Sequence, residues 1–178
     1  MKQITFIAIA IFIATTTTAR GQTNRNTQNA PEDWRTFETR EFNIQYPANF
    51  ELDTSGQMGT SLFLFVPQSA HSALFRENFN LVIQDLRGFN MSLDDFVELS
   101  EGQIEQFVEN GNLIESKRVG TDHFLTYTGR QGQFDLKWMQ RFTIQNERAY
   151  ILTFTARQSR FDNYIEIATK IMDSFKIK

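Results

Sequence analysis

Apolar and polar residues alternate along two neighbouring stretches near the C-terminus of the chain. Apolar side chains occupy alternate positions over residues 134–144, and they do so again over residues 150–156. Alternation with a period of two is typical of a half-buried β-strand. The polar residues Asn146 and Glu147 separate the two stretches. The pattern therefore predicts a β-hairpin with its turn at these two residues.

The hydrophobic period changes after the second of these strands. Ser159 stands where a helix N-cap is expected, with Asp162 three residues further on. Apolar residues then recur at spacings of three and four, which places them on one stripe of an α-helix. The stripe consists of Phe161, Tyr164, Ile165, Ala168, Ile171, Met172 and Phe175. A hairpin followed by such a helix predicts that the helix packs against the sheet.

The first part of the domain shows further strand patterns. Phe42, Ile44 and Tyr46 alternate up to Pro47, which has no N–H for a strand ladder and should end a short hairpin. Residues 62–66 are apolar at every position, which is typical of a strand covered on both faces. Another strand is expected over residues 79–86.

A second helix is predicted to begin after Ser92. Ser92 and Asp95 have the spacing of a capping box. Asn110 and Gly111 should end the helix, because glycine readily adopts the left-handed conformation found at helix ends. The expected buried stripe consists of Leu93, Phe96, Val97, Ile104, Phe107 and Val108.

Strands over residues 113–119, 124–128 and 134–144 follow with short links between them. The turns are expected at 120–122 and 129–133, and both contain glycine. Links this short favour antiparallel pairing, since a parallel crossover needs about a dozen residues or more. The sequence therefore predicts an α+β fold, in which one domain forms an α/β/α sandwich around a mainly antiparallel β-sheet.

The N-terminal residues have a different composition from the domain. Lys2, an apolar segment at 4–14 and small residues around Arg20 form the pattern of a cleavable signal peptide over residues 1–21. The alternative is a membrane anchor, but the apolar segment is shorter than the roughly 20 residues that span a bilayer. No stable membrane anchor is therefore expected after signal cleavage. Residues 22–33 are polar and predict a flexible linker, which leaves 34–178 as the domain.

Charge and cysteine content exclude several classes of function. The chain has 18 basic and 21 acidic residues, a formal net charge of −3, and no basic block. Nucleic acid is therefore not an expected partner. The chain has no cysteine, which excludes disulfides, thiol nucleophiles, cysteine-ligated metals and lipid attachment to cysteine. Together with the signal peptide, this predicts a periplasmic or secreted bacterial protein.

The candidates for catalysis and metal binding are few. The two histidines, His71 and His123, lie on separate segments, and Asp122 adjoins the second. A metal site needs three or four converging ligands, and a serine triad needs a histidine aligned by a carboxylate. The glycines form no phosphate-binding motif. We therefore predict no catalytic residues, no metal ligands and no cofactor.

Two charged groups have both a structural and a functional interpretation. Asp94 and Asp95 suggest acid–base or calcium chemistry, but the first turn of a helix also favours negative charge. Lys137 and Arg141 share one face of a strand and form a cationic stripe. Such a stripe suits an anionic ligand, whereas the structural interpretation is a solvated sheet face or rim, which we favour.

The strongest candidate for partner binding is the loop at 67–78, which is long for a connection between strands. Leu74, Phe75 and Arg76 combine apolar side chains with an arginine, which is the composition of an interface anchor. We predict that these three residues bind a protein partner. The alternative is that Leu74 and Phe75 pack back into the core.

Several segments carry a family resemblance. They are Phe-Asn-Ile-Gln-Tyr-Pro at 42–47, Phe-Asn-Leu-Val-Ile at 79–83, the helix opening after Ser92, and the terminal helix ending at Phe175. Their order resembles the PsbP-like superfamily, whose fold is shared with a yeast nuclear-import factor that binds Ran and with bacterial exported proteins. The resemblance implies an α/β/α sandwich and an accessory or binding role. The chain lacks the lipobox cysteine of the bacterial lipoprotein relatives.

Three functional hypotheses follow. The leading one is an exported, non-enzymatic binding or accessory protein that docks a protein partner in the cell envelope through loops or a sheet edge, and it predicts exposed apolar surface. The first alternative is a carrier of a small apolar ligand, which predicts an enclosed apolar pocket. The second alternative is a hydrolase, which predicts titratable residues converging in a cleft.

Overall fold

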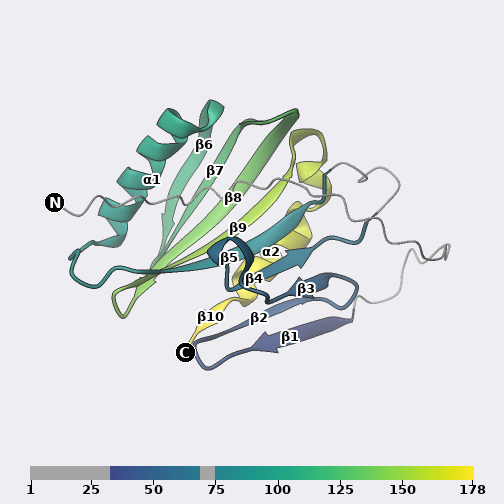
Figure 1. Ribbon diagram of the computed structural model, residues 1–178, viewed down its shortest axis with the longest axis horizontal. Helices are drawn as coiled ribbons and strands as arrows, with labels where there is room; N and C mark the ends of the chain where they lie inside the picture. The colour runs from purple at the N-terminus through teal and green to yellow at the C-terminus, as the bar shows by residue number, and fades with distance from the viewer. Residues whose placement is uncertain (1–32, 69–74) are drawn as a thin grey trace.

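A seven-stranded antiparallel sheet forms the centre of the protein (Figure 1). The structure is a computed structural model that describes residues 33–68 and 75–178. The predicted signal peptide and nearly all of the predicted linker lie outside the described residues. The strands of the large sheet, in spatial order, are β3 (Glu51–Asp53), β4 (Leu62–Phe65), β5 (Asn78–Asp85), β9 (Arg148–Arg157), β8 (Phe134–Gln145), β7 (Asp122–Gln131) and β6 (Glu109–Val119).

A smaller sheet lies beside the large one. It consists of β1 (Trp34–Glu38), β2 (Phe42–Pro47) and β10 (Lys176–Ile177), with β2 in the middle. The predicted hairpin ending at Pro47 is confirmed. The last strand was not predicted, because two residues after a helix are too few to show a period.

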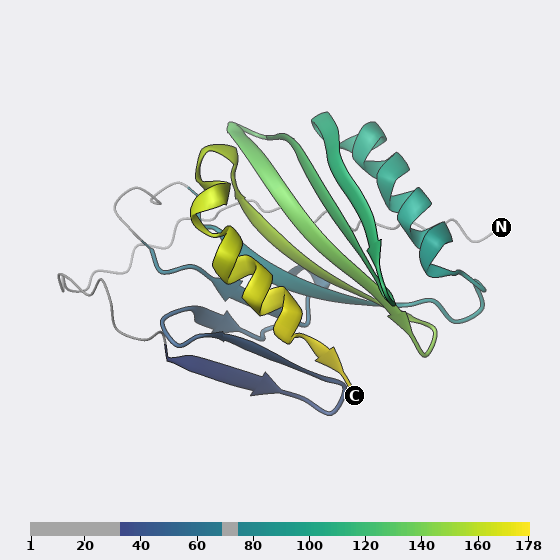
Figure 2. The same cartoon turned by 180° about the vertical axis from the view of Figure 1, so that it is seen from behind.

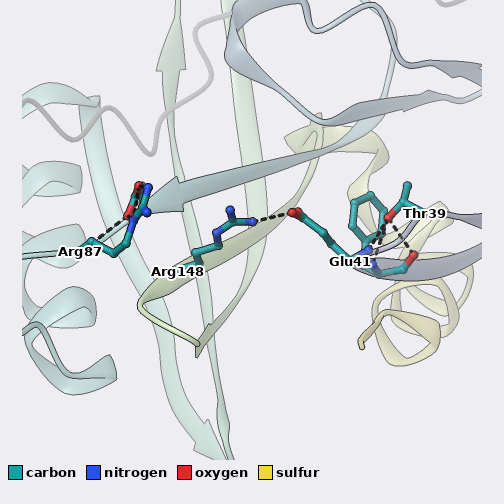
Figure 3. A network of polar contacts seen from close by, with 6 residues as sticks. Thr39, Glu41, Arg87 and Arg148 are labelled. Carbon is teal, nitrogen blue, oxygen red and sulfur yellow. Dashed lines mark hydrogen bonds and ion pairs between the residues drawn. The ribbon is translucent and has the colours of Figure 1, made fainter.

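Polar contacts join the two sheets at the turn between β1 and β2 (Figure 3). Arg148 at the start of β9 donates from Nη1 to Glu41 Oε1 at 2.7 Å. The backbone N–H of Glu41 in turn donates to Thr39 Oγ1 at 3.1 Å, which fixes the turn. The ion pair is exposed, so we expect it to orient the two sheets and to add little to stability.

Two helices lie on opposite faces of the large sheet, as the two views show (Figures 1 and 2). They are α1 (Leu93–Phe107) and α2 (Ile165–Ser174). Strand β9 has side chains in both resulting cores: Leu152 and Phe154 belong to the core beneath α2, whereas Ile151 belongs to the core beneath α1. The predicted α+β fold, an α/β/α sandwich around an antiparallel sheet, is confirmed.

The small sheet also packs into the core beneath α2. Ile44 of β2 and Leu81 of β5 are fully buried there with Ile171 of α2. On the other face, Phe96 of α1 contacts Phe142 of β8 edge-on, with ring centroids 5.5 Å apart. Strand β4 is buried at every residue, as its continuous apolar run predicts.

The beginning of α1 follows the prediction, and its end differs from it. Ser92 and Asp95 form the capping box, each accepting from the backbone N–H of the other. Phe107 is 67% exposed, so its predicted place in the core is wrong. The helix ends at this residue, whereas Val108, the C-cap, is in the core as predicted.

The chain after α1 turns at a different residue from the one expected. Asn110 has the left-handed conformation, with φ of 53°, and Gly111 does not. A Cβ at Gly111 would lie 2.6 Å from the carbonyl oxygen of Ile104. Glycine is therefore required here by the close approach of α1 and β6 rather than by a left-handed turn.

The predicted N-cap of the C-terminal helix is wrong. Residues Gln158–Asn163 form a 3₁₀ helix, and α2 begins only at Ile165 without a side-chain cap. Most of the apolar stripe holds across the break, because Phe161, Ala168 and Ile171 are all buried in one core. Ile165, which the prediction also placed in the stripe, is exposed, so its predicted burial is wrong. The hydrophobic period thus predicted the packing of this segment and missed its change of helix type.

Each two-residue turn of the sheet contains a residue whose backbone adopts positive φ. Asn146 and Glu147 both have positive φ, so the predicted turn between β8 and β9 is confirmed. The turn between β7 and β8 is Gly132 and Gln133, shorter than predicted. Gly129 lies inside β7, where a Cβ would be 2.2 Å from Val108 Cγ1.

We expect Gly129→Ala to lower the free energy of unfolding by about 1–3 kcal/mol, because the added methyl group overpacks the contact with buried Val108. Gly102→Ala is the matched control. Gly102 is an exposed residue of α1 with nothing within 4 Å of a Cβ, so alanine there should stabilise by about 0.5–1 kcal/mol. Urea unfolding of both variants measures the change in the free energy of unfolding. Changes of the same sign in the two variants would contradict the prediction.

Candidate functional site

Strand β6 forms one edge of the large sheet. Among the described strands it pairs with β7 only, and it is 11 residues long. Ten of these residues are exposed. Soluble proteins usually protect a long edge strand, because its free N–H and C=O groups can pair with another strand. The length and exposure of β6 make it a candidate docking edge.

Exposed apolar side chains accompany this edge. Helix α1 lies beside β6 in both views (Figures 1 and 2). Of the eight large apolar residues that are exposed in the described chain, five belong to α1 and β6. They are Leu99, Phe107, Leu113, Ile114 and Val119. We call β6 together with the exposed residues of α1 the β6 edge. These exposed apolar residues are the reason to consider the β6 edge for the docking hypothesis, which calls for exposed apolar surface.

Polar contacts hold the β6 edge in place against α1 and β7. Arg118 of β6 forms an ion pair with Asp94 of α1. Ser116 Oγ of β6 lies 2.8 Å from His123 Nε2 of β7. The edge strand is therefore anchored by side chains on its α1 face, while its outer backbone groups stay accessible. Asp94, proposed from sequence as a first-turn acid, serves this anchoring.

Burial beneath α1 lowers the pKa of His123, and the charge of Arg118 acts in the same direction. The carboxylates of Glu101 and Asp94 oppose the shift. The buried Nδ1 of His123 has no hydrogen-bond partner among residues 33–68 and 75–178. Because no carboxylate aligns the ring, the Ser116–His123 pair lacks the geometry of a serine triad.

Stability should fall as the pH decreases through about 6.5, the pKa of histidine in an unfolded chain. The folded-state pKa of His123 is the lower one, so the unfolded state takes up the proton first and acid favours unfolding. Above this window both states are neutral and the effect vanishes. Urea unfolding at several pH values should show that the free energy of unfolding depends less steeply on pH in His123→Gln than in the unchanged protein. An identical slope would contradict the prediction.

The predicted histidine–aspartate neighbours point to opposite faces of β7. His123 faces α1, whereas Asp122 contacts Arg141 and Thr143 on the α2 side. His71 lies outside the described residues. Within the described ranges, no group of three or more histidine or acidic residues is arranged to hold a metal ion.

The cationic stripe on β8 lies beneath α2 and is not a solvated sheet face, so that sequence interpretation is wrong. Arg141 donates to the carbonyl oxygens of Met172 and Phe175 at the end of α2. Lys137 lies 4.3 Å from the centre of the Phe161 ring and 3.7 Å from Asp162. Both cations therefore hold C-terminal elements on the sheet.

The residues predicted to bind a partner lie in different environments. Leu74 is outside the described residues. Phe75 is 6% exposed and packs against Phe134, with ring centroids 5.3 Å apart, so it lies in the core as the alternative interpretation stated. Arg76 binds Glu51 at 2.8 Å and donates to the carbonyl oxygen of Val66. Partner binding by these residues stays a prediction.

Two surface clefts bear on the carrier hypothesis. Both open to solvent, with volumes of about 480 and 500 Å³. Polar side chains form most of each lining. The first is lined by Gln133, Phe134, Asp135, Arg157, Gln158 and Ser159, and the second by Trp34, Asn43, Gln45, Lys170, Asp173, Ser174 and Lys176. Neither is the enclosed apolar pocket expected for a carrier.

Comparison with solved structures shows a PsbP-like fold. Cyanobacterial PsbP (CyanoP) from Synechocystis sp. PCC 6803 matches with a TM-score of 0.61 and 13% identity, over 88% of this chain and 98% of that one. LpqN of Mycobacterium tuberculosis, involved in cell envelope biogenesis, matches with a TM-score of 0.60 and 11% identity, over 84% of this chain and 86% of LpqN. The Saccharomyces cerevisiae Ran-binding protein Mog1p matches with a TM-score of 0.55 and 8% identity, over 82% of this chain and 96% of Mog1p.

At these identities the likeness establishes the fold alone. No family model matches the chain, and no curated protein matches its sequence. None of the described helices has the length and apolar character needed to cross a membrane. The β6 edge was not predicted residue by residue, because the strand pattern at 113–119 does not reveal which strand ends the sheet.

Proposed function

We propose that this protein is an exported, non-enzymatic accessory protein that binds a protein partner through the β6 edge. The observation that carries the proposal is the edge itself, an 11-residue strand with almost complete exposure and apolar side chains beside it. An extended segment of a partner can add to such an edge as a further strand, with backbone hydrogen bonds giving affinity and side chains giving specificity.

The relatives by fold support a binding role. Mog1p is a Ran-binding protein, and LpqN is involved in cell envelope biogenesis. The N-terminal pattern supports export to a bacterial periplasm or beyond, with residues 1–21 removed as a signal peptide. The proposed partner is therefore a protein of the cell envelope.

A photocrosslinking side chain at position 114 tests the proposal. Ile114 of β6 is 51% exposed, and Met58, in a 3₁₀ helix before β4, is 52% exposed. The two positions thus form a matched pair with equal exposure. In the native host we expect a discrete protein adduct from position 114 and none from position 58.

The second part of this test is a proline substitution in β6, at a residue whose backbone N–H points to the free edge. Val119 lies opposite Asp122 across a two-residue turn, so in the alternating ladder the N–H of Ser116 points away from β7. Ser116→Pro removes this N–H and the hydroxyl that contacts His123, and it should abolish the adduct from position 114. Ser116→Ala loses the hydroxyl alone and should keep the adduct. Equal labelling at both positions, or no adduct from position 114, would overturn the proposal.

A further inference from the structure

The free backbone groups of β6 follow from its hairpin with β7. Val119 lies opposite Asp122 across the two-residue turn at 120–121. The pair that closes such a turn is hydrogen bonded, and hydrogen-bonded pairs then alternate along the ladder. Lys117 and Glu115 therefore bond to β7. Ser116 and Arg118 present their N–H and C=O groups at the free edge.

Charge restricts how this edge can pair with a copy of itself. In a two-fold antiparallel pair, one residue lies opposite the same residue of the other strand. A centre at Glu115, Lys117 or Arg118 would place like charges opposite each other, which is destabilising. A centre at Ser116 instead places Glu115 opposite the partner's Lys117, and Lys117 opposite the partner's Glu115.

The side chains also suit a centre at Ser116. Glu115 and Lys117 are both exposed on the face of β6 turned away from α1, and neither forms an ion pair within the described part of the chain. The Ser116 side chain points to the α1 face, where it contacts His123, so only its backbone lies at the two-fold centre. Its free N–H and C=O could then form two mutual hydrogen bonds.

We infer that β6 pairs antiparallel with β6 of a second copy of this chain, with the two Ser116 residues at the centre. The large sheets of the two copies then form one continuous sheet. This inference rests on the proposed function of the β6 edge and names its partner as the same protein. The register is set by two symmetric Glu115–Lys117 pairs.

Charge reversal tests this register. Sedimentation velocity of the exported full-chain product, over a range of concentrations at low salt, should show a monomer–dimer equilibrium. Glu115→Lys and Lys117→Glu should each raise the dissociation constant about tenfold, because each replaces two attractive contacts with two repulsive ones. The double variant exchanges the charges and should restore association.

Asp173→Lys is the matched control for Glu115→Lys, since it makes the same change of charge on an exposed residue of α2 and should leave the equilibrium unchanged. Circular dichroism of each variant confirms that it is folded. The inference would be overturned if neither single reversal raised the dissociation constant of the dimer, or if the double variant stayed dissociated.

The crosslinker at position 114 separates this inference from the proposed function. An adduct between two copies of the chain supports both. A monomer that forms an adduct with a different protein overturns self-pairing and leaves the docking edge standing. A monomer with no adduct overturns both.

Discussion

Phe154→Asp should leave little or no folded protein. Phe154 is fully buried at the centre of the core beneath α2. Its ring lies 4.7 Å from Phe79 and 5.3 Å from Phe161, measured between centroids. Loss of the ring costs about 3–5 kcal/mol, and an unpaired carboxylate in the same place adds several more. The sum is comparable to the whole stability of a domain, about 5–15 kcal/mol.

The control for this variant is Phe107→Asp, the same chemical change at a residue that is 67% exposed. Aspartate at the end of α1 opposes the helix dipole, so a loss of about 0.3–1 kcal/mol is expected there. Phe154→Leu should still fold, with a loss of about 1–2 kcal/mol, which allows a quantitative comparison. Thermal unfolding followed by circular dichroism measures all three. Equal melting temperatures for the two aspartate variants would show that Phe154 is not in the core.

The elements were predictable from the sequence because their hydrophobic periods are strong and local. The existence of strand β9 and the hairpin turn at Asn146 follow from alternation, and the capping box at Ser92 follows from spacing. The half-buried character predicted for β9 is wrong, because residues 149–156 are all buried between the cores beneath α1 and α2. The 3₁₀ segment before α2 could not be predicted, because its residue Phe161 fits the helical stripe equally well. Strand β10 is defined only by its contact with β2, far away in the sequence.

The site was less predictable because it depends on the order of strands in space. Leu113 and Ile114 look like core residues in the sequence, yet they are exposed because no described strand follows β6 in the sheet. Phe75 shows the opposite case, since its polar surroundings in the sequence suggest a surface loop and it packs in the core. Exposure of single side chains is a tertiary property that a local pattern does not contain.

The cationic stripe on β8 illustrates the same limit. Alternation correctly placed Lys137 and Arg141 on one face of the strand, and polarity suggested that this face meets water. In the structure α2 and the 3₁₀ helix cover it, and each cation has a carboxylate partner there. A charged side chain in a strand can thus be a structural anchor when an opposite charge and a helix end converge on it.

Arg141→Met should lower the free energy of unfolding by about 2–4 kcal/mol, the second largest effect that we expect. The Arg141 side chain is 14% exposed and lies 2.8 Å from Asp122, which is 18% exposed. It also satisfies carbonyl oxygens at the C-terminal end of α2, where a cation complements the helix dipole. Methionine keeps the aliphatic stem but leaves the Asp122 carboxylate without its cation and the helix end without its donor.

Arg130→Met provides the matched comparison on the neighbouring strand. Arg130 pairs with Asp135 at 3.1 Å, but these side chains are 44% and 63% exposed, so a loss of less than about 1 kcal/mol is expected. Adding Asp122→Asn to Arg141→Met should recover part of the loss, because it removes the uncompensated charge. Urea unfolding of these variants gives the coupling energy, and hydrogen exchange should show weaker protection in α2 of Arg141→Met. If Arg141→Met cost no more than Arg130→Met, the pair would be a surface contact and α2 would be held by its apolar stripe alone.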